Sequence, residues 1–136
     1  MSKRGRILIV DDDTDFSEST AAFLRARGYE VAQAHSGLDG LKQARLDAPD
    51  LILMDVMMGE RTEGFFTVQR IRRDQGLSRI PVIMVSSLYE DDPSFGIDPE
   101  RAWLAHDAFL PKPLNMDALL VTVKEQMEAA AARGTS

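Results

Sequence analysis

Cysteine is absent from this 136-residue sequence, which excludes disulfide bonds, thiol nucleophiles and thiolate metal sites. Long apolar runs are absent too, because none approaches the roughly 20 residues that span a bilayer. The basic N-terminus at 1–6 leads into only four apolar residues, so we expect neither a signal peptide nor a membrane anchor. Together these absences favour a cytoplasmic protein with no membrane partner.

Positive charge is scarce. Sixteen Lys and Arg stand against 22 Asp and Glu, which gives a net charge of −6 and a field that repels phosphate backbones. We therefore expect no direct nucleic-acid partner. The length, the 44% hydrophobic and the 28% charged residues are typical of one ordinary domain. We expect a single domain over 1–136, with its core at about 5–127 and a C-terminal tail at 128–136.

Apolar runs of strand length recur along the chain. Three of them, at 7–10, 51–54 and 80–85, are nearly continuous, which is typical of parallel strands covered on both faces. Weaker candidates lie at 29–34 and 108–110, and short or alternating strands suit the edges of a sheet.

Between these runs the apolar residues follow a helical period. Gly28 supplies a stop for the first helix, Ser36 a cap for the second, and Asn115 a cap for the fifth. Each of these helices is expected to have one inward face. In the first helix this face consists of Phe16, Thr20, Phe23 and Leu24, and in the second of Leu38, Leu41 and Ala44. In the third, near 65–73, it consists of Phe65, Val68 and Ile71, and in the fifth of Met116, Leu119, Leu120, Val123 and Met127. We expect a fourth helix to begin at 98–100, the second to end at 48–50, and the fifth to fray from 129 onwards.

Strand and helix thus alternate five times, which predicts an α/β fold with right-handed crossovers. The expected architecture is a five-stranded doubly wound parallel sheet of order 2-1-3-4-5, a (βα)5 flavodoxin-like arrangement. Ligands of such sheets bind beyond the carboxyl ends of the strands, beside strands 1 and 3. Functional residues are therefore expected at that edge.

The residues that directly follow four of the strands could together form one chemical site. Carboxylates follow strand 1 at 11–13 and strand 3 at Asp55, a hydroxyl follows strand 4 at Ser86, and an ammonium follows strand 5 at Lys112. Clustered carboxylates repel one another unless a hard divalent cation neutralises them, which favours Mg²⁺, with Mn²⁺ as a substitute. The pocket would hold a phosphoryl group on Asp55, because a carboxylate can attack phosphorus while metal and lysine offset the developing charge.

Four motifs, at 7–13, 50–58, 81–86 and 109–113, closely resemble those of the receiver domain of two-component response regulators. The resemblance covers nearly the whole chain, and the motifs stand in the correct order.

The resemblance assigns a role to each matching position. Asp55 is similar to the phosphoacceptor, and Lys112 to the phosphate-binding lysine. The residues that correspond to metal ligands are Asp12 directly, Asp11 through water, Asp55, and the backbone carbonyl of Met57. Ser86 and Phe109 match the switch hydroxyl and the switch aromatic. Taken by itself, Lys112 would be interpreted as solvated surface, Ser86 as a strand terminus and Phe109 as core packing. The family also implies a cis peptide bond before Pro113.

By this resemblance the protein is a signalling phosphoacceptor and not an enzyme. Its expected partners are a sensor histidine kinase or histidine phosphotransfer protein, and an unknown downstream protein whose binding changes on phosphorylation. Two segments depart from the family pattern. The segment at 59–63 is close to the site, and the segment at 88–99 belongs to the region that usually transmits the signal in this family.

Other functions stay open on the residues alone. The main alternative is a receiver-like interaction module that works without phosphorylation. A flavin mononucleotide carrier could use the same sheet edge, although the carboxylates at 11–13 would repel a flavin phosphate. A phosphatase with an aspartyl nucleophile would carry that nucleophile after strand 1. His35 and His106 are isolated in sequence and are interpreted as surface residues.

Overall fold

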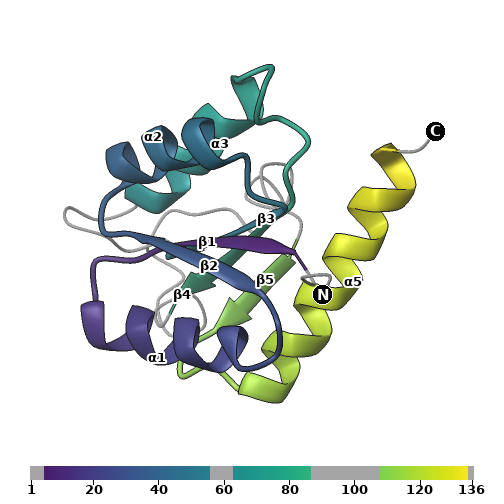
Figure 1. Ribbon diagram of the computed structural model, residues 1–136. Coiled ribbons are helices and arrows are strands. Elements are labelled where there is room, and N and C mark those ends of the chain that lie inside the picture. The colour runs from purple at the N-terminus through teal and green to yellow at the C-terminus, as the bar shows by residue number, and fades with distance from the viewer. Residues whose placement is uncertain (1–4, 56–62, 87–107, 135–136) are drawn as a thin grey trace.

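The computed structural model describes residues 5–55, 63–86 and 108–134, apart from the side chains at 63–65, 86, 109 and 133–134. Its five strands form one parallel sheet in the order β2-β1-β3-β4-β5, which confirms the predicted topology (Figure 1). The strands are β1 (Arg6–Val10), β2 (Glu30–Ala34), β3 (Leu51–Asp55), β4 (Val82–Ser86) and β5 (Ala108–Pro111). Four helices lie within the described residues: α1 (Thr14–Arg25), α2 (Gly37–Asp47), α3 (Glu63–Arg73) and α5 (Met116–Gly134).

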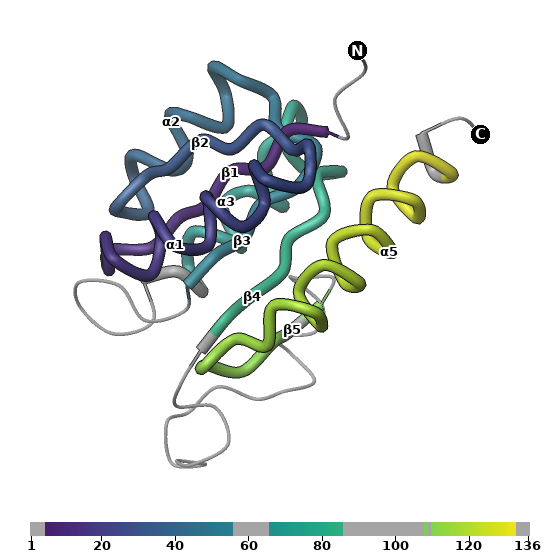
Figure 2. Tube along the Cα trace, turned by 60° about the horizontal axis from the view of Figure 1, so that its bottom comes forward, coloured from purple at the N-terminus to yellow at the C-terminus, as the bar shows by residue number. Residues whose placement is uncertain are grey.

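The sheet is buried on both faces, as the continuous apolar runs predict. Alternate residues of a strand point to opposite faces, so Leu8 and Val10 join one core cluster while Ile7 and Ile9 join the other. The first cluster is closed by α2 and α3, and the second by α1 and α5. The two helix pairs lie on opposite sides of the sheet, and α5 runs beside β5 (Figure 1, Figure 2).

The predicted inward faces of the helices are confirmed where they are described. Leu41 and Ala44 of α2, Val68 and Ile71 of α3, and Leu119 and Val123 of α5 are buried in these two clusters. One residue is wrongly placed, because Leu38 is 55% exposed and faces outwards at the start of α2. The side chain of Phe65 and the predicted fourth helix at 98–100 lie outside the described residues.

The predicted caps are present. Ser36 Oγ accepts a hydrogen bond of 3.1 Å from the Asp39 backbone N–H, and Asn115 Oδ1 accepts one of 3.0 Å from that of Ala118. Ala48 ends α2 in the left-handed conformation, with φ 45°, immediately before Pro49. These local signals place the turns that return the chain to each strand.

Several element ends differ from the sequence prediction, and three of the differences have an identifiable local cause. β4 begins at Val82 and not at Ile80, because Ile80 N–H donates to Leu77 O in a preceding turn and Pro81 has no N–H to donate. β2 begins at Glu30, because Tyr29 N–H still donates to Leu24 O at the end of α1. α5 continues to Gly134, well past the point where fraying is expected, since the run at 129–132 is rich in alanine, the strongest helix former.

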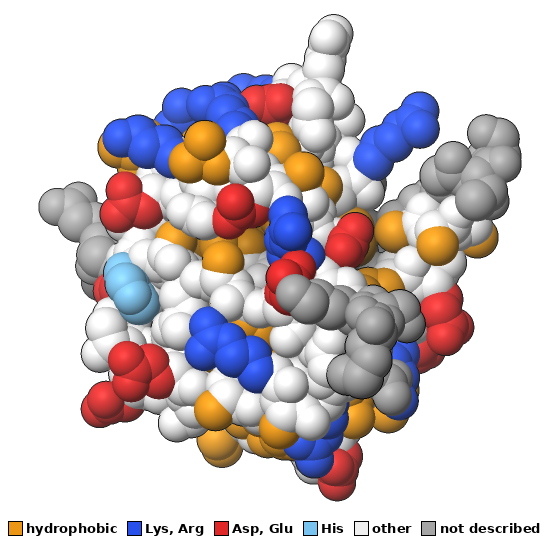
Figure 3. All heavy atoms as spheres, in the orientation of Figure 1, with side chains coloured by type: hydrophobic (Ala, Val, Ile, Leu, Met, Phe, Trp, Pro, Cys, Tyr) orange, Lys and Arg blue, Asp and Glu red, His pale blue; other side chains and the backbone are white. Residues whose placement is uncertain are grey.

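Charge is unevenly distributed over the surface. Several Lys and Arg side chains gather over α2 and α3 although the net charge of the chain is −6 (Figure 3). The acidic cluster lies at another place, at the carboxyl edge of the sheet. No helix in the described ranges combines the length and the apolar character needed to cross a membrane.

Candidate functional site

Three carboxylates meet at the carboxyl edge of the sheet. Asp11 and Asp12 directly follow β1, and Asp55 is the last residue of the neighbouring β3. One oxygen from each lies within 4.8 Å of the others, with Asp11 and Asp55 buried and Asp12 exposed. Oxygens on opposite sides of an octahedral Mg²⁺ are about 4 Å apart, and this ion prefers oxygen ligands. The donor set therefore fits a hard divalent cation, as the sequence predicts.

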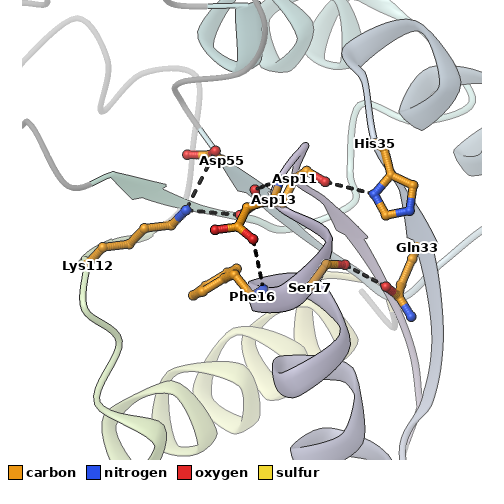
Figure 4. Close-up of polar contacts among 8 residues, drawn as sticks. All are labelled: Asp11, Asp13, Phe16, Ser17, Gln33, His35, Asp55 and Lys112. Atoms are coloured by element: carbon orange, nitrogen blue, oxygen red, sulfur yellow. Dashed lines mark hydrogen bonds and ion pairs between the residues drawn. The ribbon is translucent and has the colours of Figure 1, made fainter.

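Asp11 is held on every side by hydrogen bonds. Its backbone N–H donates to Ala34 O at 3.0 Å, and its carboxylate Oδ1 accepts from the Asp13 N–H at 2.9 Å. Its backbone carbonyl lies 3.0 Å from His35 Nδ1 (Figure 4). Since a carbonyl can only accept, Nδ1 carries the hydrogen in this contact. The backbone of Asp11 is thus held by Ala34 and His35, at the end of β2, and its carboxylate by the backbone of Asp13.

The ammonium of Lys112 points into the acidic cluster from the end of β5. Its Nζ lies 3.1 Å from Asp11 Oδ2 and 3.6 Å from Asp55 Oδ2, and its side chain is only 18% exposed (Figure 4). The same Nζ lies 4.2 Å from the centroid of the Phe16 ring. The peptide bond from Lys112 to Pro113 is cis, as the resemblance implies.

Among the described residues, negative charge exceeds positive charge in the cluster. Three carboxylates lie together there, and the Lys112 ammonium pairs with two of them, Asp11 and Asp55, at distances where electrostatic interactions are strong in a buried site. Burial disfavours an unbalanced negative charge, so the cluster favours a bound divalent cation and, beside it, a group with oxygens that lysine and metal can share. A phosphoryl group meets this description.

The structure brings four of the predicted site residues together: Asp11, Asp12, Asp55 and Lys112. Two others are placed by their backbones, because Ser86 ends β4 opposite Pro111 while Phe109 pairs with Met84. The side chains of Ser86 and Phe109 are outside the described residues, and so is all of Met57. The atypical segments at 59–63 and 88–99 also lie there, except for Glu63 at the start of α3.

Sequence reasoning missed two residues that contact the site. His35 is exposed as predicted, but it also bonds to the backbone of Asp11. Phe16 belongs to the inward face of α1 as predicted, but its ring also lies against Lys112. The available signals were positional: His35 directly follows β2 beside the switch point, and Phe16 lies in the first turn of the helix that follows β1.

Comparison with known proteins identifies the family. The family model described as "Response regulator receiver domain" matches residues 7–124, which is most of the chain. The chain belongs to the response-regulator receiver family of two-component signalling.

Two curated relatives of this receiver differ in how much of their own length it matches. It is 37% identical over 120 residues to the "DNA-binding dual master transcriptional regulator RpaA" of Synechocystis. That match covers 88% of this chain but 47% of that protein. It is 36% identical over 119 residues to "Protein PilH" of Pseudomonas aeruginosa, and there the match covers 87% of this chain and 93% of the relative. The receiver thus spans about half of one relative and nearly all of the other.

Solved structures agree with this assignment. The receiver superposes with a TM-score of 0.82 and 30% identity on the "response regulator receiver domain protein (CheY-like)" of Methanospirillum hungatei, with 97% of this chain and 99% of that chain covered. A solved structure from Chloroflexus aurantiacus gives a TM-score of 0.80, also at 30% identity, with 93% of this chain and 99% of that chain covered. The described residues around the acidic cluster therefore have the receiver fold.

Proposed function

We propose that this receiver accepts a phosphoryl group on Asp55 from a phosphohistidine. The donor is a sensor histidine kinase or a histidine phosphotransfer protein, and Mg²⁺ is the ion that makes the transfer possible. The chain acts as a phosphoacceptor of the cytoplasm and not as an enzyme with turnover. Phosphorylation changes its affinity for a downstream protein. The receiver at 1–136 is a single domain whose core ends near 127.

In the proposed reaction an oxygen of the Asp55 carboxylate attacks phosphorus. The new bond joins that oxygen to phosphorus, the phosphorus–nitrogen bond of phosphohistidine breaks, and the imidazole leaves with the bonding electron pair. Asp12, Asp55, Asp11 through water and the Met57 carbonyl would hold Mg²⁺, and the ion would supply positive charge to the phosphoryl oxygens. Lys112 offsets further charge on these oxygens with its ammonium.

Signal output is proposed to begin at β4 and β5. The Ser86 hydroxyl donates to a phosphoryl oxygen, and the ring of Phe109 packs inward in the phosphorylated state. The modification favours one of two pre-existing states through these differential contacts. The adjacent backbone pairing of Ser86 with Pro111 and of Met84 with Phe109 supports this coupling, because both positions lie on neighbouring strands.

One observation carries the proposal. The ammonium of Lys112 lies 3.6 Å from Asp55 and 3.1 Å from Asp11, so the cation that follows β5 is beside the carboxylates at the ends of β1 and β3. Elements that are distant in the chain supply a nucleophile, metal ligands and a phosphate-binding cation at one point. The family match supports the same function.

The proposal is tested by phosphorylation with a small donor. Purified protein is incubated with Mg²⁺ and acetyl phosphate, and its intact mass is recorded beside that of Asp55→Asn. We expect the added mass of one phosphoryl group in the wild type only, and no addition when the metal is chelated. Glu125→Gln, which removes an exposed carboxylate of α5 far from the site, is the matched control and should be phosphorylated like the wild type.

Two results would contradict the proposal. Equal phosphorylation of Asp55→Asn would show that another residue is the phosphoacceptor. Failure of the wild type with acetyl phosphate and with a panel of phosphorylated histidine kinases would favour the interaction module that works without phosphorylation.

A further inference from the structure

The ammonium of Lys112 has contacts of two kinds. It pairs with the carboxylates of Asp11 and Asp55, and its Nζ lies 4.2 Å from the centroid of the Phe16 ring. The two carboxylates belong to the cluster that fits a divalent cation. A metal that binds there competes with lysine for their negative charge. The aromatic contact does not involve a metal ligand, so the same competition leaves it intact.

The position of Phe16 is well defined by the start of α1. Asp13 Oδ1 caps this helix by accepting a hydrogen bond of 3.1 Å from the Phe16 N–H (Figure 4). The Phe16 side chain is half-buried and packs against the core cluster of α1 and α5. Capping and packing together hold the ring below the ammonium, while the cap residue itself lies two positions from Asp11.

An aromatic ring attracts a cation through the negative charge of its face, and this attraction increases when water is excluded. The Lys112 side chain is only 18% exposed, so the contact with Phe16 belongs to the better-shielded cases. A leucine at position 16 could retain much of the apolar packing, but it would have no such attraction for the ammonium. The electrostatic role of the ring can therefore be separated from its packing role.

We propose that Phe16 is a positioning residue for Lys112. Its ring keeps the ammonium at the phosphoryl site when a divalent cation takes over Asp11 and Asp55. This inference rests on the proposed function, because it assigns the ring a part in holding the lysine that binds the phosphoryl group. In this role Phe16 acts through Lys112 and supplies no ligand to the metal.

The contact can be measured directly by NMR, without any phosphorylation. Protons above an aromatic ring are shifted upfield, so the Lys112 Hε resonances report on the Phe16 ring. We expect an upfield shift in the wild type that persists at saturating Mg²⁺, is retained in Phe16→Tyr and is lost in Phe16→Leu. Loss of the shift when Mg²⁺ binds the wild type would overturn the proposal.

The consequence is measured with beryllofluoride, a stable mimic of the phosphoryl group on carboxylates. In the presence of Mg²⁺, Phe16→Leu should bind this probe about three- to tenfold more weakly than the wild type, while Phe16→Tyr binds it normally. The affinity for Mg²⁺ alone should stay within about twofold in both variants, because the ring supplies no ligand. A purely structural role of Phe16 would change both affinities together.

Phe23 offers a matched control. It lies on the same helix and is remote from the acidic cluster. The Arg27 Cζ atom lies 3.7 Å from the centroid of its ring, so this ring also contacts a cation. Phe23→Leu should leave beryllofluoride affinity unchanged. Equal weakening by Phe23→Leu and Phe16→Leu would overturn the proposal, since both would then act through stability.

The failures of the two proposals are distinguishable. If the wild type takes up neither beryllofluoride nor a phosphoryl group, the proposed function fails and the role of Phe16 fails with it. If the wild type takes up both and Phe16→Leu binds beryllofluoride equally well, only the role of Phe16 is wrong.

Discussion

Asp55 illustrates how clustered carboxylates lower the stability of the folded state. It is 5% exposed, and one of its oxygens lies within 4.8 Å of oxygens of Asp11 and Asp12. Like charges at such distances in a partly buried site repel by about 1 kcal/mol or more, and one lysine offsets only part of this repulsion. Sites that bind a cation commonly carry such a cost in their metal-free state.

Removing the charge of Asp55 should therefore stabilise the protein. We predict that Asp55→Asn raises the free energy of unfolding by about 1 kcal/mol in the absence of divalent cations, because the repulsion within the cluster falls. Urea titrations of the two proteins in a chelating buffer measure the difference. Glu125→Gln, an exposed change of the same chemical kind, should stay within about 0.5 kcal/mol of the wild type. A clear loss of stability in Asp55→Asn would show that the carboxylates are not mutually repulsive.

At the level of elements, α2 lies unusually close to the sheet. A Cβ built on Gly40 would come within 2.8 Å of Val10 Cγ2, closer than real Cβ atoms approach. Val10 belongs to β1, directly before the acidic pair at Asp11 and Asp12. The absence of a side chain at Gly40 thus permits the close approach of α2 to the strand that leads into the acidic cluster.

This contact reverses the usual effect of a substitution. Alanine normally replaces a glycine inside a helix with a gain of up to about 1 kcal/mol. We predict instead that Gly40→Ala lowers the free energy of unfolding by about 1–3 kcal/mol, because the added methyl overpacks the interface with β1. Val10→Ala combined with Gly40→Ala should cost less than the sum of the two single changes. Additive losses in this double-mutant cycle would contradict the account.

A second link between elements joins α2 to the end of α3. Arg45 contacts Asp74 Oδ2 at 2.9 Å, and Asp74 Oδ1 also accepts from the Gly76 N–H at 2.9 Å. The Arg45 hydrogen bond, followed by that of Gly76, lowers the pKa of Asp74 below its ordinary value of 3.8. A group whose pKa is lowered by folding contributes stability above its unfolded pKa and loses it as the pH falls through its folded pKa.

This sign gives a pH-dependent prediction. The stability difference between the wild type and Asp74→Asn should be constant at neutral pH and shrink from about pH 4 downwards. Thermal unfolding of both proteins between pH 7 and pH 3 measures it. Because the pair is on the surface, the difference should also decrease at high salt. A difference that grows with acidification would contradict the assigned pKa direction.

For the molecule as a whole, the sequence predicts the architecture better than the element ends. Ile7 to Val10 and Leu51 to Met54 are apolar on both faces, so their runs are continuous and indicate a covered parallel sheet. The starts of β2 and β4 are shifted because Tyr29 and Ile80 make turn hydrogen bonds that no apolar pattern encodes.

Part of the site could be predicted from the sequence, and part of it could not. Asp55 and Lys112 could be placed from the sequence because strand order alone brings their positions to one edge. The contacts of Phe16 and His35 could not, because they depend on side-chain direction across two elements that sequence spacing does not relate. Ser86 and Phe109 stay predictions in their switch roles.

Cation binding at the cluster should affect the stability of the whole molecule. A ligand that binds only the folded state stabilises it by about 2.7 kcal/mol at 100 times its dissociation constant. We predict that Mg²⁺ raises the thermal midpoint of the wild type and raises that of Asp12→Asn much less. Calorimetry with Mg²⁺ and with a monovalent salt at the same ionic strength separates binding from ionic strength. An equal rise in both proteins would place the cation elsewhere.

The most direct test of the central claim is chemical mapping of the phosphorylated residue. Borohydride reduces an aspartyl phosphate to homoserine, which peptide mass spectrometry locates in the chain. After treatment with Mg²⁺ and acetyl phosphate, the account predicts this conversion at position 55 and at no other carboxylate. Conversion at position 11 or 12, or at none in fully phosphorylated protein, would contradict it.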